Sequence, residues 1–275
     1  FWDDADDAGG VSGDRYNDAN DLTSAGGNEG FLPIGNNPTT FRGEYDGAGY
    51  SINNLTINRP NTEYIGLFGF ASNSFSITNL KLTNVEISGK GYTAPLVGRL
   101  NYSNKGIDNC SASGSVSATY SVGGLVGYSW GVNANNRNNI SNSFSHVSVS
   151  GTSHYIGGLA GFSRQSIILN SYSAGSVVGQ NSSGGLLGYK SGGVIITNSF
   201  YDTTTSGKSD TGKGTGKTTT QMKTSGTFTN WDFNNIWAID TSGSINGGYP
   251  YLKGSNFSDG NHYYESLVTL YNLDD

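Results

Sequence analysis

The chain has 275 residues and a formal net charge of −6; only 13% of its residues are charged, and 42 are glycine, about twice the average usage of ~7%. This composition argues against an ordinary helical enzyme, and the lack of a basic stripe argues against nucleic acid or an anionic membrane surface as a partner. Seventeen Tyr, 12 Phe and four Trp supply apolar surface for a buried core, so disorder is not expected either.

Residues 1–37 are rich in Asp and Asn, and we expect them to form an irregular N-terminal cap or an incoming coil ahead of the repeats described below. Calcium prefers oxygen ligands, so the crowded carboxylates make a structural calcium site one hypothesis and a solvated acidic loop the other. The candidate ligands are Asp3, Asp4, Asp6 and Asp7. The acidic start and the lack of an 18-residue apolar stretch favour neither a signal peptide nor a spanning helix, so we expect a piece of a longer protein.

A repeated segment dominates the middle of the chain. Its five copies are YIGLFGF, APLVGRL, VGGLVGY, IGGLAGF and SGGLLGY. Their last glycines are Gly69, Gly98, Gly127, Gly161 and Gly188, which are 29, 29, 34 and 27 residues apart. A period of this length is typical of one coil of a solenoid.

A second element recurs once per coil: an isoleucine, one further residue and an asparagine. The asparagines are Asn54, Asn79, Asn109, Asn142, Asn170 and Asn198. Asparagine tolerates a left-handed backbone, and stacked side-chain amides can hydrogen-bond to one another, so we predict a structural asparagine ladder at one corner of the coils. Apolar alternation after each asparagine, as at Val147 and Val149, predicts a strand with one buried face.

These patterns together predict an all-β fold, a right-handed parallel β-helix with irregular terminal caps, whose repeat region spans residues 38–201. Paired glycines permit tight turns where a Cβ would clash. The 34-residue coil contains a polar insertion, Gly131 to Asn139, which we expect to protrude as a loop.

Aromatic residues near the coil edges are the candidate ligand contacts, because aromatic rings stack on the apolar faces of sugars. We single out Tyr102, Tyr120, Tyr128 and Trp130. The alternative is that the aromatic residues that end each repeat form an inner or outer stack of purely structural character.

The repeat is lost after Tyr201. Residues 202–252 bring several large aromatic residues and are predicted to form a C-terminal cap, while residues 253–275 are predicted to be a linker or the start of another module. The stretch TGKGTGKTTT, Thr211 to Thr220, lacks one glycine of the phosphate-binding loop pattern and is predicted to be a surface loop. Cys110 is the single cysteine, so no disulfide can form within the chain.

Carboxylates are scarce where the repeats are clearest: Asn109 through Tyr201 contains no Asp or Glu. A parallel β-helix enzyme that cleaves polysaccharide needs clustered carboxylates, or calcium with basic residues, on one face. We therefore expect no enzymatic activity; a carbohydrate-active enzyme remains the alternative, with Glu44, Asp46, Glu63 and Glu86 as its candidate carboxylates.

The chain resembles GLUG-repeat proteins, on the signature Gly124-Leu125-Val126-Gly127 and its later copy Gly158-Leu159-Ala160-Gly161. One copy departs from the signature, with Pro95 in place of the first glycine. The resemblance implies one module of a secreted or cell-surface bacterial adhesin-like protein, extracellular in location, and it does not imply a ligand. We expect a module that is monomeric by itself, requires no cofactor and contacts glycan or protein ligands through loops or one face. A passive spacer is a further alternative.

Overall fold

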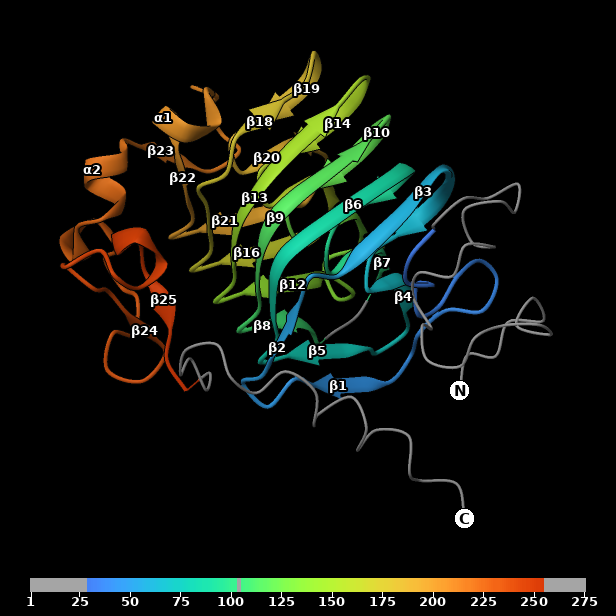
Figure 1. The fold of residues 1–275 in the computed structure, drawn as a ribbon, viewed down its shortest axis with the longest axis horizontal. Helices are drawn as coiled ribbons and strands as arrows, with labels where there is room; N and C mark the ends of the chain where they lie inside the picture. Colours follow the sequence, from blue (N-terminus) through green and yellow to red (C-terminus); the bar gives the residue numbers. More distant parts are fainter. Residues whose placement is uncertain (1–28, 103–104, 255–275) are drawn as a thin grey trace, which may run out of the picture.

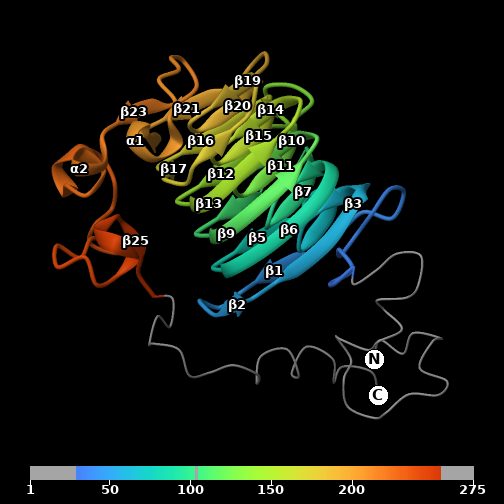
Figure 2. The ribbon, with the colours of Figure 1, turned by 45° about the horizontal axis from the view of Figure 1, so that its top comes forward.

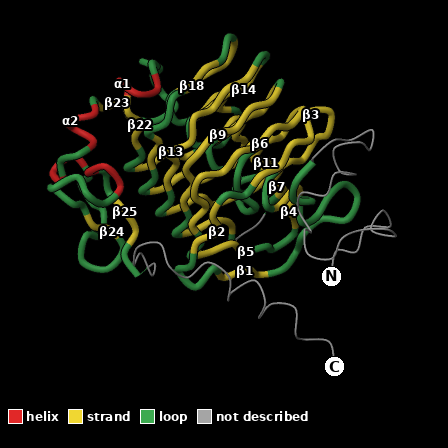
Figure 3. The backbone as a smooth tube through the Cα atoms, in the orientation of Figure 1, coloured by secondary structure: helices red, strands yellow, loops and turns green. Residues whose placement is uncertain are grey.

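A computed structural model describes residues 29–102 and 105–254. Each turn of the chain adds strands to three sheets, and successive turns stack along one axis (Figures 1 and 2). Strands fill the coils, whereas helices occur only near the C-terminal end (Figure 3). All pairings within the three sheets are parallel, so the predicted all-β parallel β-helix is confirmed.

Sheet A has twelve strands: β2 (Ser51–Asn53), β3 (Thr56–Ile65), β6 (Lys81–Thr93), β9 (Ser111–Ala118), β10 (Tyr120–Gly123), β13 (Phe144–Gly151), β14 (His154–Gly157), β17 (Tyr172–Ser173), β18 (Val177–Val178), β19 (Asn181–Gly184), β22 (Phe200–Asp202) and β23 (Thr215–Lys217). Sheet B has five: β4 (Phe68–Ser72), β7 (Val97–Asn101), β11 (Val126–Trp130), β15 (Ala160–Arg164) and β20 (Leu187–Lys190). Sheet C has six: β1 (Glu44–Asp46), β5 (Ser76–Thr78), β8 (Gly106–Asp108), β12 (Asn138–Ser141), β16 (Ser166–Leu169) and β21 (Ile195–Thr197).

Apolar side chains stack in columns inside the coils. The isoleucine of the repeated Ile-x-Asn element forms one column in sheet C: Ile77, Ile107, Ile140, Ile168 and Ile196 are successive partners in register. The leucine of the Gly-Leu-x-Gly signature forms another, with Leu67, Leu96, Leu125, Leu159 and Leu186 all buried. The sequence period therefore places the same residue at the same interior point of every coil, which is the source of the hydrophobic stabilisation.

The last glycine of each repeat forms a column in which the backbone itself is packed. A Cβ added to Gly98 would lie 2.7 Å from the carbonyl oxygen of Gly69, and one added to Gly127 would lie 2.6 Å from that of Gly98. The same contact recurs at Gly161 and Gly188, at 2.6 and 2.5 Å. Glycine is required here because these distances leave no room for a side chain.

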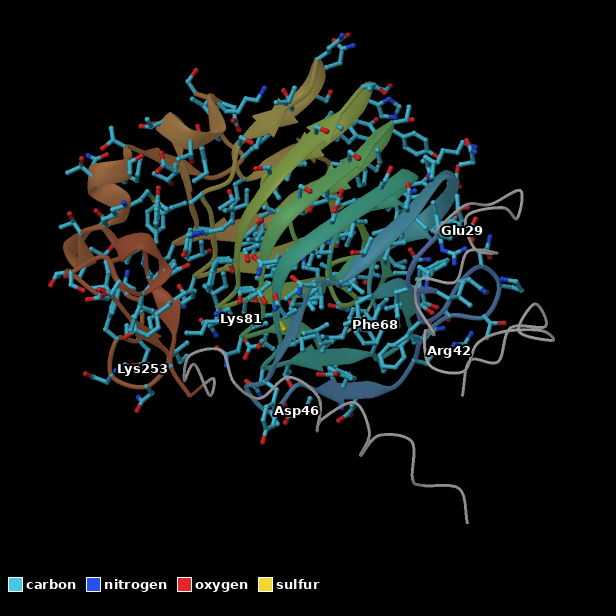
Figure 4. All side chains as sticks on the ribbon, in the orientation of Figure 1. Glu29, Arg42, Asp46, Phe68, Lys81 and Lys253 are labelled. Carbon is cyan, nitrogen blue, oxygen red and sulfur yellow. The ribbon has the colours of Figure 1, made fainter. Side chains whose placement is uncertain are left out.

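The predicted asparagine ladder is present in two segments, with every member in the left-handed backbone region. The Nδ2 of Asn109 donates to Asn79 Oδ1 at 2.7 Å, and the Nδ2 of Asn79 donates to Asp46 Oδ1 at 2.9 Å. Asp46 therefore ends this segment at the corner after β1 (Figure 4), and the hydrogen bond from Asn79 holds the pKa of its carboxyl below the usual value.

The second segment begins at Asp108 rather than at Asn109. Asn142 donates to Asp108 Oδ1 at 2.9 Å; Asn170 donates to Asn142 at 3.5 Å, and Asn198 to Asn170 at 3.3 Å. Asp108 thus takes over the accepting role at the coil where the long insertion begins.

Asn54 does not belong to this ladder, so that part of the prediction is wrong. Its neighbour Ile52 pairs with Leu82 in sheet A, not with Ile77 in sheet C. Asn54 is left-handed like the others, with φ 60°, but it occupies a turn within the edge of sheet A. A local tripeptide cannot distinguish the two corners, because both require the same backbone conformation.

Residues 29–43 form an incomplete coil at the N-terminal end. Ile34 pairs with Phe68 and Phe41 with Ala71, both in parallel. This part of the predicted N-terminal segment therefore behaves as an incoming coil, and the four candidate calcium ligands lie outside the described residues.

Residues 203–254 depart from the coil pattern. They contain α1 (Thr203–Ser206), α2 (Thr219–Met222), two 3₁₀ turns (Ser225–Thr227 and Asn246–Gly248) and the antiparallel pair β24 (Trp237–Ala238) and β25 (Tyr251–Leu252). No described helix has the length and apolar character needed to cross a membrane. The segment lies along the side of the solenoid (Figure 1). There it covers an outward-facing aromatic column of Phe144, Tyr172 and Phe200.

Residues 211–220, predicted to be a surface loop, contain instead β23, which pairs in parallel with β22, and the start of α2. The residues just before β23 close the free edge of the last coil. The ammonium of Lys213 donates to the carbonyl oxygens of Ser183 and Gly188, at 2.9 and 3.1 Å. The carboxylate of Asp210 accepts from the backbone N–H of Gly185 at 2.8 Å. Charged side chains thus satisfy the unpaired edge groups that a further coil would otherwise bind.

A buried histidine under the C-terminal segment predicts a pH dependence of stability. Burial lowers the pKa of His146 to about 4, and its Nε2 lies 3.0 Å from the Tyr172 hydroxyl, with Asp202 and Lys223 nearby. Since the unfolded pKa is about 6.5, the unfolded chain binds the proton first as the pH falls. The stabilisation is complete above about pH 6.5, and we expect a loss of about 2 kcal/mol between about pH 7 and pH 5 in urea unfolding.

His146→Gln should remove this pH slope, whereas His154→Gln should preserve it because His154 is exposed. A slope that survives the His146 substitution would contradict the assignment.

Candidate functional site

Nine aromatic side chains form a continuous strip on the outside of the solenoid, where sheet A passes into sheet B. The strip follows the ends of β3, β6, β10 and β14 and the adjacent strands of sheet B, which lie side by side in Figure 2. We call this surface the aromatic strip; its members are Tyr64, Phe70, Tyr92, Tyr120, Tyr128, Trp130, Tyr155, Phe162 and Tyr189.

The glycine column places the first set of these side chains. In β11 and β15, Val126 pairs with Ala160 and Tyr128 with Phe162, while the intervening glycine makes no pair. The residue after the glycine therefore turns outward, and the next residue, Ser129, is fully buried. Residues Phe70, Arg99, Tyr128, Phe162 and Tyr189 all occupy this position.

A left-handed corner places the second set. Tyr64, Tyr92 and Tyr155 have φ values of 65°, 50° and 64°, which non-glycine residues rarely adopt. Ser121 and Ser182 share this conformation, so the coil corner imposes it rather than the aromatic ring. Three of the five corners nevertheless carry tyrosine, and each of these rings joins the aromatic strip.

The rings of the strip stack mainly on one another. The ring centroids of Tyr128 and Phe162 are 4.3 Å apart, with an interplanar angle of 9°. The Cζ of Arg164 lies 4.2 Å from the centroid of the Trp130 ring. The faces that sugars would stack on are therefore largely occupied, and the outer stack that was the alternative expectation describes the geometry better. Ring edges and phenol hydroxyls, not ring faces, remain for contact with a ligand.

The phenols of Tyr92, Tyr120 and Tyr128 keep their protons at neutral pH. Burial raises the pKa of Tyr128 to about 12, and burial also raises the pKa of Tyr92. The pKa of Tyr120 is raised by burial and by the carboxylate of Glu63, which accepts a hydrogen bond from the Tyr120 hydroxyl. These three tyrosines thus act as neutral hydrogen-bonding groups.

Two arginines lie within the strip. The Arg99 guanidinium is 4.9 Å from the Phe70 ring centroid and within 6 Å of those of Tyr64, Tyr92 and Tyr128. Its Nε donates to Asn101 Oδ1 at 3.2 Å. The sequence analysis missed both arginines, although Arg99 occupies the position after the repeat glycine that elsewhere holds an aromatic residue.

Three of the four predicted ligand contacts, Tyr120, Tyr128 and Trp130, lie in the aromatic strip. Tyr102 is 40% exposed and lies beyond it, with its backbone N–H donating to the Trp130 carbonyl oxygen at 3.0 Å. The predicted insertion at 131–139 begins directly after Trp130, so it borders the strip. Residues 132–135 are exposed, whereas Gly131 and Asn138 are buried and Asn138 already belongs to β12, so only the first part of the range protrudes.

The carboxylates considered for catalysis have structural partners or stand apart. Glu44 pairs with Lys105, Asp46 ends the asparagine ladder, and Glu63 binds Tyr120 and lies 3.6 Å from Lys90. Glu86 is exposed on sheet A. Within residues 29–102 and 105–254, no group of three or more His, Cys, Asp or Glu side chains is arranged to hold a metal ion.

Comparison with known proteins gives three similarities. The chain is 28% identical over 340 aligned positions to a "Putative Gly-rich membrane protein" of Evansella cellulosilytica, covering 78% of this chain and 39% of that protein. It is 36% identical over 124 residues to halomucin of Haloquadratum walsbyi, covering 42% of this chain and 1% of that protein. The chain thus spans well under half the length of either relative.

A crystal structure of "a putative immunoglobulin A1 protease" from Bacteroides ovatus superposes with a TM-score of 0.59 at 21% identity. The superposition covers 77% of this chain and 78% of that one. At this identity the likeness shows a shared fold alone. No protein-family model matches the chain.

Proposed function

We propose that this chain is a non-catalytic GLUG-repeat module of an extracellular, adhesin-like surface protein, and that the aromatic strip binds polysaccharide. The observation that carries the proposal is the continuous row of outward-facing rings on an otherwise regular solenoid. The similarity of this chain to a relative named as a membrane protein supports a surface location. No cofactor is required by this role.

The strip suits a repeating polymer because the coils repeat. Equivalent side chains recur at a coil spacing of about 4.8 Å, so a chain of sugars lying along the solenoid axis meets a similar group at each coil. Phenol hydroxyls bind sugar oxygens, and ring edges contact the apolar C–H groups of the sugar rings. Each contact is weak, and the affinity arises from several of them acting on one polymer.

Replacing two strip residues tests the proposal. Trp130→Ala with Tyr189→Ala removes a partly buried indole and a tyrosine that is 41% exposed. We expect the affinity of the isolated chain for its best polysaccharide in a panel to fall about tenfold, or about 1.4 kcal/mol. Affinity electrophoresis or calorimetry measures the change. Tyr50→Ala is the matched control, because Tyr50 is equally exposed, at 46%, but lies outside the strip.

The two alternatives give different results in the same panel. A passive spacer binds no polysaccharide, and that outcome would overturn the proposed function. A carbohydrate-active enzyme releases product, with activity lost on Glu44→Gln or Asp46→Asn; we expect no product with the unmodified chain.

A further inference from the structure

The face of sheet B that bears the aromatic strip carries basic residues and no acid. Arg99, Arg164 and Lys190 lie on β7, β15 and β20, and the five strands of sheet B contain no Asp or Glu. The whole chain has a net charge of −6. A local excess of positive charge on an acidic protein therefore coincides with the candidate binding surface.

The guanidinium groups of Arg99 and Arg164 pack against aromatic rings, but no carboxylate among the described residues forms an ion pair with either of them. Arg164 lies over Trp130 and Arg99 among four rings, so the rings cover the planar faces of the guanidinium groups. The four ion pairs among the described residues use neither arginine. The N–H donors at the edge of a guanidinium match the geometry of carboxylate and sulfate oxygens.

Glu63, an acid that borders this surface, already has partners. The Glu63 carboxylate accepts a hydrogen bond from the Tyr120 hydroxyl and forms an ion pair with Lys90, whose side chain is 52% exposed. Arg99 and Arg164 are two coils apart, roughly 10 Å along the axis, and Lys190 is one coil further. Lys190 pairs with the buried Ser163 rather than with an outward-facing residue, and its ammonium donates to the Gly212 carbonyl oxygen at 3.4 Å. A linear polymer lying along the strip can therefore contact the two guanidinium groups.

We propose that the polysaccharide bound by the aromatic strip is acidic, with its carboxylate or sulfate groups bound by Arg99 and Arg164. This inference rests on the proposed function and names its ligand class. The tyrosine hydroxyls and ring edges contact the sugar rings, while the cations select anionic units.

The test uses matched polymers that differ in charge: polygalacturonate against its methyl ester, and dextran sulfate against dextran. We expect the unmodified chain to bind at least one charged member at least tenfold more tightly than its neutral partner, with a preference that weakens between about 0.05 M and 0.5 M salt. The pair that shows the preference identifies whether carboxylate or sulfate is bound.

Arg99→Gln with Arg164→Gln should abolish the preference for the charged polymer. Because Arg99 packs against four rings, Arg164→Gln alone provides a second variant, and it should reduce the preference about threefold. Lys223→Gln is the control, since Lys223 lies 5.0 Å over the Tyr249 ring in the C-terminal segment, outside the strip. Circular dichroism confirms that each variant is folded.

The outcomes separate the two proposals. Equal binding of charged and neutral polymers would overturn the acidic ligand and leave polysaccharide binding standing, whereas no binding to any polymer would overturn both. Binding of polyglutamate as tightly as of the best charged polymer would overturn the assignment to sugar.

Discussion

Gly127→Ala is expected to cost about 3 kcal/mol or more in the free energy of unfolding. An added Cβ would lie 2.5 Å from the backbone N of Thr93, 2.6 Å from the carbonyl oxygen of Gly98 and 2.7 Å from the carbonyl carbon of Tyr92. All three are backbone atoms of neighbouring coils, so no side-chain rotation relieves the clash. The coils on either side must move apart, which breaks parallel pairing in sheets A and B.

Gly192→Ala is the matched control for this experiment. Nothing lies within 4 Å of a Cβ at Gly192, and its backbone is outside the left-handed region, so its stability should change by less than about 0.5 kcal/mol. Urea unfolding followed by far-ultraviolet circular dichroism measures both variants. Equal stability of the two would show that the glycine column is not required for packing.

Asp202→Ala is expected to detach the C-terminal segment from the solenoid. Asp202 is fully buried; its Oδ1 accepts the backbone N–H groups of Thr204 and Thr205, and its Oδ2 accepts the hydroxyls of Thr219 and Tyr249 at 2.7 Å each. Removing the carboxylate leaves four donors without their acceptor, at a cost of about 3 kcal/mol or more. Tyr249→Phe removes one of these bonds and should cost about 1 kcal/mol.

Tryptophan fluorescence reports on this detachment, because Trp231 and Trp237 are buried in the C-terminal segment. In Asp202→Ala we expect their transition to precede the loss of β-structure seen by circular dichroism. Asp240→Ala is the control, since the Asp240 carboxylate is bonded only to Ser242 and Ile245 of its own loop. Coincident transitions in the Asp202 variant would show that the two parts unfold as one unit.

The sequence by itself determined the coil, because each column of the solenoid repeats in the sequence. The buried leucine, the Ile-x-Asn corner and the glycine column recur once per period, so position along the chain predicts position in the stack. Serine follows the asparagine at Ser143, Ser171 and Ser199, and each hydroxyl accepts from the backbone N–H of the coil before it. This serine ladder also follows the sequence period, although the predictions above do not include it.

Only the tertiary structure decided which corner each segment occupies. Asn54 carries the same tripeptide signal as Asn79 but sits in sheet A, because register depends on the neighbouring coil and not on the tripeptide. Asp46 and Asp108 are the final acceptors of the two ladder segments for the same reason. The column requires an acceptor there, and a carboxylate supplies it, whereas the repeated sequence pattern contains asparagine alone.

The candidate site was predictable only in part. Tyr128 and Trp130 lie on the repeat, so their neighbourhood was expected, but Tyr64, Tyr92 and Arg99 join them across coils 27 or more residues apart. Contacts of that kind depend on the stacking direction and on the outward orientation of the side chain that follows each repeat glycine. The period of a sequence determines what repeats, whereas the packing of successive coils determines which side chains share a surface.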